Sequence, residues 1–417
     1  MAPKHVAAIL ALCLSAAGVA WADDGEAPGV SLGKSSYVYS ASFPKPARDI
    51  VPQACSPQLS PDGRYLLYPT AVGDTPADEN QAANQAGLQG VMRWLSEPVK
   101  IMLRDLETGK DRRLPVGTPP RSLALLGGLA SPFGGDPNTL VLPKLLETKT
   151  PARGMPDPRS MALLLYDIPS GKVRRLPVRA AGALAILSPD GERLAVTVAK
   201  KADRMTELPE IRLGPVDGNE FNEAAVKGIV MGFGPAGKNM VVFQPPYTPA
   251  VPRHANKKRA RLLLYNIETG KSTNLPVAVR GIPRGKGDFE WMAKGKYLAY
   301  PDVEKYMKNP GANQEEKRRI VTRIWDVSGG KPLTDLPQLI PVGPGPTEKS
   351  LLCRKNRGVL SGEGIWLYDH AARKITRVDR RNELLLDTNG SKIVYGIVDK
   401  NELKVYVADL KVEKVGK

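Results

Sequence analysis

A short pattern recurs along the chain. It reads MLRDLETGKDRRLP at residues 102–115, LLYDIPSGKVRRLP at 164–177 and LLYNIETGKSTNLP at 263–276. Looser copies lie at 210–226, 323–337, 366–369 and 405–409. In each full copy an apolar run reaches an Asp or Asn, a turn with a Gly follows, and a second run begins. Because Gly adopts the positive φ that a tight turn requires, each copy predicts a β-hairpin.

A second pattern lies between these copies. It reads SPDGRYLLY at residues 60–68 and SPDGERLAV at 188–196, with looser forms at 234–238, 293–297 and 387–391. Its Pro-Asp-Gly turn joins a short strand to an apolar strand, so it predicts another hairpin. The two hairpins together form a four-stranded unit that recurs about seven times, at spacings of roughly 40 to 60 residues.

The repeat predicts an all-β protein. Four short antiparallel strands cannot bury both faces of their sheet alone, whereas radial repetition buries the faces between neighbouring sheets. We therefore expect one β-propeller domain over residues 36–417, with about seven four-stranded blades; roughly six or eight remain possible. A strand near Ser36–Ser42 could complete the last blade and close the ring. Residues 23–35 are expected to form a flexible leader.

The beginning of the chain has the pattern of a signal peptide. Lys4 precedes an apolar run over residues 6–20, and Ala20-Trp21-Ala22 fits an A-x-A cleavage site. We expect residues 1–22 to be removed and the protein to be periplasmic or secreted. No later run reaches about 20 apolar residues, so no transmembrane segment is expected after cleavage.

Two cysteines remain after that cleavage, Cys55 and Cys353. In an oxidising compartment they could form one disulfide that closes a loop of roughly 300 residues. The alternative is a pair of buried free thiols.

The repeats resemble those of TolB-type and WD40-like propellers. A more particular likeness covers residues 38–220. FPKPARDIV at 43–51, LLGGL at 125–129 and TLVLP at 139–143 are similar to the N-terminal β-propeller of glutamyl-endopeptidase-like members of the prolyl oligopeptidase (S9) peptidase family. The resemblance implies a propeller fold and an ancestry shared with peptidases.

The same resemblance implies a C-terminal α/β-hydrolase domain, which this sequence does not display. Such a domain needs on the order of 200 residues after the propeller, whereas the repeats here continue to Asp409. GVSLG at 29–33 matches the Gly-x-Ser-x-Gly elbow, but no apolar strand precedes it and no helix follows. We therefore name no catalytic residues and expect the chain not to be an enzyme.

Metal and cofactor chemistry has little support in the sequence. The histidines are His5, His254 and His370, and we expect the last two to be exposed loop residues. No cysteine–histidine cluster has zinc spacing. Glu315 and Glu316 precede a basic run and suggest a salt-bridged helical insertion. We expect neither a metal nor a cofactor.

The chain is strongly basic, with 60 Lys and Arg, 43 Asp and Glu and a formal net charge of +17. Many of these bases lie at the turn between the third and fourth strand of a blade, where they would form a basic ring. They are Lys110, Arg112, Arg113, Lys172, Arg174, Arg175, Lys271, Lys331 and Lys374. The functional interpretation is attraction to an acidic envelope polymer, an anionic lipid headgroup or an acidic protein surface. The alternative is that Gly-Lys is a good exposed turn. Nucleic acid would use the same charges, but export makes it a poor candidate.

Insertions between second and third strands gather on the opposite face. They cover residues 73–98, 144–160, 244–261 and 302–319, and the third contains Arg253, Lys257, Lys258, Arg259 and Arg261. Long loops on one end of a rigid scaffold often bind partners. Neutral drift would produce the same insertions.

Three hypotheses follow. The first is an exported, non-catalytic propeller that binds or scaffolds a protein or a polyanionic envelope component and is otherwise monomeric. The second is the propeller part of a prolyl-oligopeptidase-type serine peptidase whose hydrolase domain is missing or on another chain. The third is a propeller enzyme that acts at its central channel, which so few histidines make hard to build. We favour the first.

Overall fold

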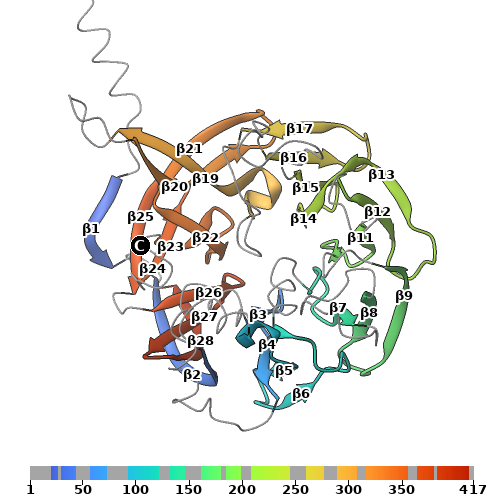
Figure 1. Cartoon of the computed structure of the whole chain (residues 1–417). Helices are drawn as coiled ribbons and strands as arrows, with labels where there is room; N and C mark the ends of the chain where they lie inside the picture. The colour runs from blue at the N-terminus through green and yellow to red at the C-terminus, as the bar shows by residue number, and fades with distance from the viewer. Residues whose placement is uncertain are drawn as a thin grey trace, which may run out of the picture.

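The computed structural model has seven β-sheets arranged in a ring around a central axis (Figure 1). The residues that it describes are 20–26, 30–43, 57–72, 93–121, 132–145, 161–179, 185–198, 208–244, 260–276, 289–307, 316–355, 364–379 and 383–412. The sheets are the blades of a β-propeller, so the predicted fold and the predicted blade number are both confirmed.

The strands within each blade follow one another outward from the axis. Blade 1 consists of β3 (Gln58–Leu59), β4 (Tyr65–Ala71), β5 (Val99–Asp105) and β6 (Asp111–Arg113). Blade 2 consists of β7 (Thr139–Leu145), β8 (Met161–Asp167) and β9 (Val173–Arg179), and blade 3 of β10 (Ala185–Leu187), β11 (Arg193–Val198), β12 (Glu210–Pro215) and β13 (Asn222–Lys227). Blade 4 consists of β14 (Ile229–Phe233), β15 (Asn239–Gln244), β16 (Arg261–Asn266) and β17 (Ser272–Leu275).

The other three blades complete the ring. Blade 5 consists of β18 (Glu290–Met292), β19 (Tyr297–Met307), β20 (Glu316–Asp326) and β21 (Lys331–Pro337). Blade 6 consists of β22 (Leu339–Pro344), β23 (Ser350–Lys355), β24 (Ile365–Asp369) and β25 (Lys374–Asp379). Blade 7 consists of β26 (Leu384–Thr388), β27 (Lys392–Asp399), β28 (Glu402–Val412) and the N-terminal β2 (Val30–Ser42).

The innermost strand of blade 2 is reduced to a single bridge among the described residues. Phe133 pairs with Leu140, and the N–H of Val141 donates to the carbonyl of Pro132 at 2.9 Å. This bridge occupies the position that a full strand takes in the other blades.

The N-terminal strand closes the ring. β2 pairs antiparallel with β28 from Val30–Val412 to Ser42–Glu402, which confirms the expectation for residues 36–42. The strand begins earlier than predicted, because residues 30–35 belong to the sheet and not to a flexible leader. The reason is that β28 provides a pairing edge along this whole length, and Val30 is buried between blades 6 and 7.

One further strand lies outside blade 6. β1 (Ala20–Glu26) runs parallel to β25, so residues 23–26 are also extended where a flexible leader was expected. Residues 1–19, most of the predicted signal peptide, lie outside the described residues.

The hydrophobic core is divided among the blade interfaces. One cluster fills each of the seven junctions between neighbouring blades, and it is built from the alternating inward residues of their strands. Leu66, Leu194 and Leu298 are fully buried in three of them. Burial of an aliphatic side chain contributes about 1.5–3 kcal/mol, so the blades stabilise one another. Within the described ranges, no helix is long and apolar enough to cross a membrane.

Candidate binding face

The turn between the third and fourth strands has the same structure in five blades. In blade 2 the carboxylate of Asp167 accepts hydrogen bonds from the N–H and the hydroxyl of Ser170, and the N–H of Gly171 donates to the carbonyl of Asp167 at 2.8 Å. The hydroxyl and the N–H of Ser170 lower the pKa of Asp167. The equivalent turns begin at Asp105, Asn266, Asp326 and Asp369.

A positive φ ends each of these turns. It is 69° at Gly171 and 70° at Gly109, as the sequence pattern predicted, but in blade 6 Arg373 takes this position at 51°. The turn therefore fixes the backbone in the same way in each blade, and it places the next residue, a lysine in all five, at the start of the outer strand.

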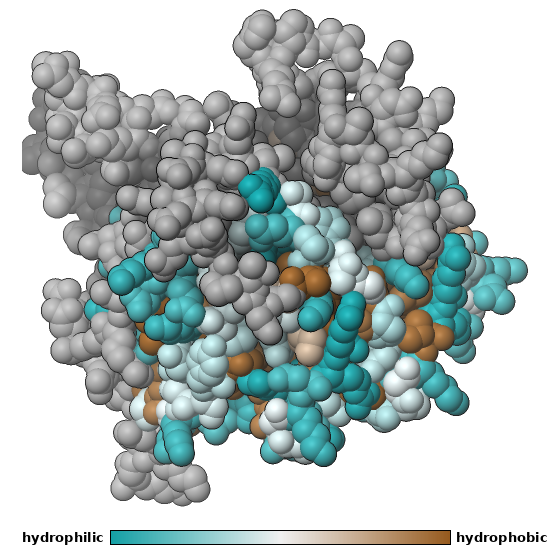
Figure 2. Space-filling view, turned by 60° about the horizontal axis from the view of Figure 1, so that its bottom comes forward, coloured by the Kyte–Doolittle hydropathy of each residue, from teal (hydrophilic) through white to brown (hydrophobic). Residues whose placement is uncertain are grey.

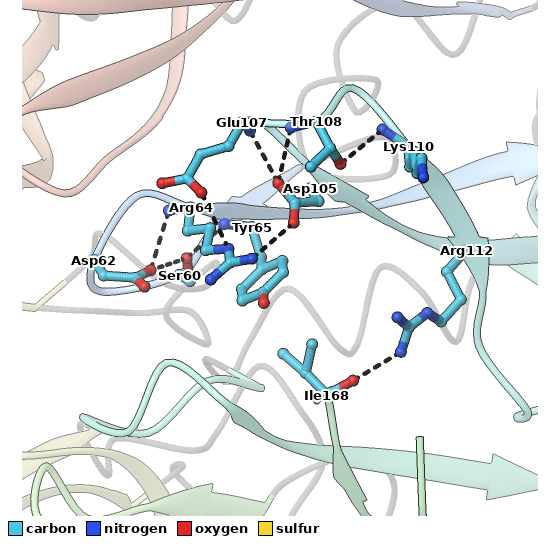
Figure 3. Close-up of polar contacts among 10 residues, drawn as sticks. All are labelled: Ser60, Asp62, Arg64, Tyr65, Asp105, Glu107, Thr108, Lys110, Arg112 and Ile168. Carbon is cyan, nitrogen blue, oxygen red and sulfur yellow. Dashed lines mark hydrogen bonds and ion pairs between the residues drawn. The ribbon is translucent and has the colours of Figure 1, made fainter. Parts of the chain in front are cut away.

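The Ser-Pro-Asp-Gly turn lies beside it in blade 1 (Figure 3). The hydroxyl of Ser60 donates to Asp62 at 2.5 Å and accepts the N–H of Tyr65 at 2.8 Å, while the N–H of Arg64 donates to Asp62 at 3.0 Å. Ser188 and Asp190 repeat these contacts in blade 3. The Ser and Asp side chains of this repeated pattern therefore hydrogen-bond within their own turn.

One backbone hydrogen bond joins the two turns in every blade. The N–H of the residue at the end of the third strand donates to a carbonyl at the first turn, at 2.7 to 3.0 Å. The donor and acceptor pairs are Leu106–Arg64, Ile168–Asn138, Val216–Glu192, Ile267–Lys238, Val327–Lys296, His370–Lys349 and Leu410–Ser391. The two kinds of turn therefore form one face of the propeller, as predicted.

Neighbouring blades also meet on this face through their first turns. The side-chain amide of Asn389 in blade 7 donates to the carbonyl of Pro61 in blade 1 at 3.2 Å. The N–H of Ala293 in blade 5 donates to the carbonyl of Glu348 in blade 6 at 2.6 Å. These contacts make the turn face a connected surface.

Some of the predicted basic residues on this face are exposed to solvent, and others contact the neighbouring blade. Lys110, Lys172, Lys271 and Lys331 are exposed, and in the described part of the chain none of them is in an ion pair. Lys374 is half-buried. Arg113 and Arg175 are exposed in β6 and β9.

Two of the predicted arginines contact the next blade. One guanidinium nitrogen of Arg112 donates to the hydroxyl of Tyr166 at 3.0 Å. The same nitrogen donates to the carbonyl of Ile168 at 2.7 Å (Figure 3). Arg174, at the same position of blade 2, donates to the carbonyls of Val216 and Asp217 in blade 3. Neither contact could be foreseen from the local pattern, and we assign both side chains to blade–blade contacts.

The structure describes fewer residues on the insertion face than on the turn face. Arg261 is exposed at the start of β16, whereas Arg253, Lys257, Lys258 and Arg259 lie outside the described residues. The helix expected near Glu315 and Glu316 is wrong, because β19 and β20 pair as far as Met307 and Glu316. The long cross-strand register keeps Glu316 extended, while Glu315 lies outside the described residues.

The Cys353 side chain has no exposed surface in β23. Burial raises the pKa of this thiol, as does the nearby Glu290 carboxylate. Cys55 lies outside the described residues, so the disulfide stays a prediction.

His370 is half-buried, contrary to the exposed position expected for it. Its Nδ1 lies 3.0 Å from the hydroxyl of Tyr368, and its ring centroid is 4.5 Å from that of Tyr297. Burial lowers the pKa of its imidazole. The described residues contain no group of three or more His, Cys, Asp or Glu that could hold a metal ion.

A groove of about 480 Å³ lies between blades 2 and 3, and the sequence analysis did not predict it. It is lined by Pro177, Val178, Val198, Arg212, Asn219, Glu220, Phe221 and Asn222. On the face drawn in Figure 2 the described residues are mostly hydrophilic, with apolar residues scattered among the polar ones.

Peptidase propellers have this fold. An acylaminoacyl peptidase from Pyrococcus horikoshii is 11% identical, with a TM-score of 0.50, over 87% of this chain and 52% of that one. The β-propeller domain of the Trilobed protease from Pyrococcus furiosus is 10% identical, with a TM-score of 0.49, over 93% of this chain and 96% of that one. The tricorn protease is 11% identical, with a TM-score of 0.45, over 76% of this chain and 30% of that one.

The likeness at this level of identity is one of fold. The chain spans about half the length of the acylaminoacyl peptidase and less than a third of the tricorn protease. No family model matches the sequence, and no curated protein matches it.

Proposed function

We propose that this chain is an exported, non-catalytic β-propeller that binds an acidic protein or a polyanionic envelope component through its turn face. The observation that carries the proposal is the repeated turn. In five blades it places a lysine at the same position, and four of these lysines are exposed. The Asp or Asn of each turn is hydrogen-bonded to its own backbone amides. The turns of blades 1 and 4 also carry an exposed glutamate, and Glu107 lies 3.6 Å from Arg64 while Glu268 lies 3.1 Å from Lys238.

Binding through such a face depends on several charges acting together. An exposed ion pair contributes only about 0.2–1 kcal/mol, so a single lysine would not hold a partner. A rigid ring that presents lysines from several blades favours a ligand with repeated negative charges, because each further contact is intramolecular. Affinity should then fall steeply as salt is added.

The experiment compares two full-length variants with the same change of charge. The first replaces Lys110, Lys172, Lys271 and Lys331 with Gln. The control replaces Lys144, Lys227, Arg261 and Lys400 with Gln; all four are exposed at the opposite ends of their strands. The probe is polyglutamate, measured by fluorescence anisotropy at two salt concentrations.

We expect the turn-face variant to lose at least about tenfold in affinity and the control to lose less than about threefold. Equal losses of affinity would show that binding depends on net charge alone, and would contradict the proposal that the turn face is the binding site. In-cell crosslinking of the exported protein, followed by mass spectrometry, would then identify the partner.

The propeller part of a prolyl-oligopeptidase-type peptidase is the second candidate function. The fold likeness to the acylaminoacyl peptidase supports it. It predicts that the same crosslinking experiment captures a serine hydrolase chain that reacts with a fluorophosphonate probe. An acidic partner without such reactivity would favour the first proposal.

A further inference from the structure

The outer edge of blade 6 differs from the other outer edges of the propeller. The outermost strand of a blade has unpaired backbone N–H and C=O groups, and it is usually exposed. All of β6 is exposed, and β9, β13, β17, β21 and β2 each have exposed residues. β25 has no exposed residue: all six are buried or half-buried.

β1 covers this edge (Figure 1). It pairs with β25 in parallel, through Ala20–Lys374, Trp21–Ile375 and Glu26–Arg377, whereas the pairs within the described blades are antiparallel. The register shifts between Trp21 and Glu26, so the ladder is interrupted. A parallel ladder is slightly less stable per residue than an antiparallel one, and an interrupted one loses further hydrogen bonds. We therefore expect β1 to dissociate from β25 more easily than the other strands separate from their neighbours.

The two strands have complementary charges in their sequences. β1 reads AWADDGE, with Asp23, Asp24 and Glu26 and no base. β25 reads KITRVD and follows Arg373, so it brings more bases than acids to this edge. An acidic extended segment therefore suits the edge.

We propose that the outer edge of β25 is a strand-addition site for an acidic, extended segment of a partner protein, and that residues 20–26 occupy it until the chain is processed. The timing rests on the proposed export. The expected cleavage after Ala22 falls inside β1 and removes Ala20 and Trp21, which leaves Glu26 as the one registered pair. A partner strand running parallel to β25 then replaces them, with backbone hydrogen bonds giving affinity and acidic side chains giving selectivity. This site is on the outer wall of blade 6 and adjoins the turn face at Lys374, the first residue of β25.

The test uses the full chain and a full-length variant in which residues 20–26 are replaced by a Gly-Ser sequence of the same length. The probe is the synthetic peptide AWADDGEAPG, which is residues 20–29 of the chain itself. Its control is AWAKKGKAPG, with the acids reversed to lysine. Binding is measured by fluorescence anisotropy, and the site is located by hydrogen exchange.

We expect the variant to bind the acidic peptide at least about tenfold more tightly than the wild-type chain does. The peptide should slow exchange in residues 374–379 and leave β17 of blade 4 unchanged. A natively folded variant that does not bind the peptide, or that binds the lysine peptide equally well, would overturn the proposal. Protection confined to another blade would also overturn it.

A second copy of the chain is the competing occupant. If the wild-type protein forms a dimer that the Gly-Ser variant cannot form, β1 of one copy pairs with β25 of another, and the assignment to a partner protein is wrong. N-terminal sequencing of the exported protein tests processing separately. A mature chain that keeps Ala20–Ala22 would contradict the timing and the cleavage prediction, whatever the peptide experiment gives.

Discussion

Tyr39 of β2 stacks on Tyr68 of β4 across the junction between blade 7 and blade 1, with ring centroids 4.6 Å apart and ring planes at 17°. The hydroxyl of Tyr68 donates to Asp111 at 2.8 Å, and Arg104 forms a 2.7 Å ion pair with the same carboxylate. A second nitrogen of Arg104 donates to the carbonyl of Val38 at 3.0 Å. The strand that closes the ring is therefore held to the first blade by both a stacked pair and a polar network.

Removing the stacked ring should weaken the closure. We expect Tyr39→Ala to reduce the free energy of unfolding by about 3 kcal/mol, since the side chain is buried and leaves a cavity. The matched control is Tyr37→Ala in the same strand, because Tyr37 is 54% exposed and should cost less than about 1 kcal/mol. Urea unfolding of the two variants measures both values, and equal costs would contradict a special role for the stacked pair.

A methyl group at Gly135 should disrupt the junction of blades 2 and 3. A Cβ there would lie 1.5 Å from the carbonyl oxygen of Pro189, so the blades would have to separate. We expect Gly135→Ala to cost about 3 kcal/mol or to prevent folding. A Cβ at Gly232 meets no atom within 4 Å, so Gly232→Ala should change stability by less than about 1 kcal/mol. Thermal unfolding compares them, and a stable Gly135→Ala protein would show that this junction is loose.

Two neighbouring arginines of β6 should separate stability from binding. Arg112→Gln loses the hydrogen bonds to blade 2 and is expected to cost about 1 kcal/mol of stability. Arg113→Gln should leave stability unchanged, since its side chain is exposed. Polyglutamate affinity should respond to Arg113 at least as strongly as to Arg112. If Arg113→Gln lowered stability more and Arg112→Gln lowered polyglutamate affinity more, Arg112 would belong to the binding surface and not to the contact between blades.

Stability should depend on the protonation of His370. Burial lowers the pKa of His370 below the ordinary value of about 6.5, so the unfolded chain binds a proton more readily than the folded one. Its contribution to stability is therefore complete above about pH 6.5 and is lost as the pH falls through the lowered pKa. We expect the free energy of unfolding to fall between pH 7.5 and 5 in the wild type, and to fall less in His370→Asn. Identical pH profiles would show that His370 stays exposed in solution.

Cys353 should be inert in the folded protein. Because its thiol is fully buried and its pKa is raised, we expect no reaction with a thiol reagent until the chain unfolds. Mass spectrometry of the alkylated protein without reduction also tests the link to Cys55. Two labelled thiols after unfolding would exclude the disulfide, and none would establish it.

The sequence predicted what local geometry determines. The turns at Ser60 and Asp167 are built from residues within a few positions of each other, so their hydrogen bonds follow from the pattern, and the blade number follows from its repetition. The contacts of Arg112 depend on where the next blade lies, which no local pattern specifies. The same holds for His370, which is half-buried against Tyr297 of the neighbouring blade.

The parts that sequence analysis missed are non-local. β1 reads as the end of a signal peptide, and only its register with β25, more than 300 residues away, makes it a strand. For the same reason the early start of β2 could not be seen without β28. The position of each lysine after its own turn follows from the local pattern, whereas the binding that we propose for these lysines awaits experiment.

The closing register also determines how the molecule resists mechanical force. Val30 is paired with Val412 and Ser42 with Glu402. Val30 is the end of β2 nearer the N-terminus and Val412 is the end of β28 nearer the C-terminus, so these two ends lie side by side in blade 7. A load applied between the two termini would act across the strands and break their hydrogen bonds one after another, starting at Val30. The ring is thus expected to open like a zip at low force, at a single blade, while the other six remain intact. β1 precedes β2 along the chain, so an optical-tweezers trace should show the release of β1 from β25 first and the opening of the β2–β28 pair next.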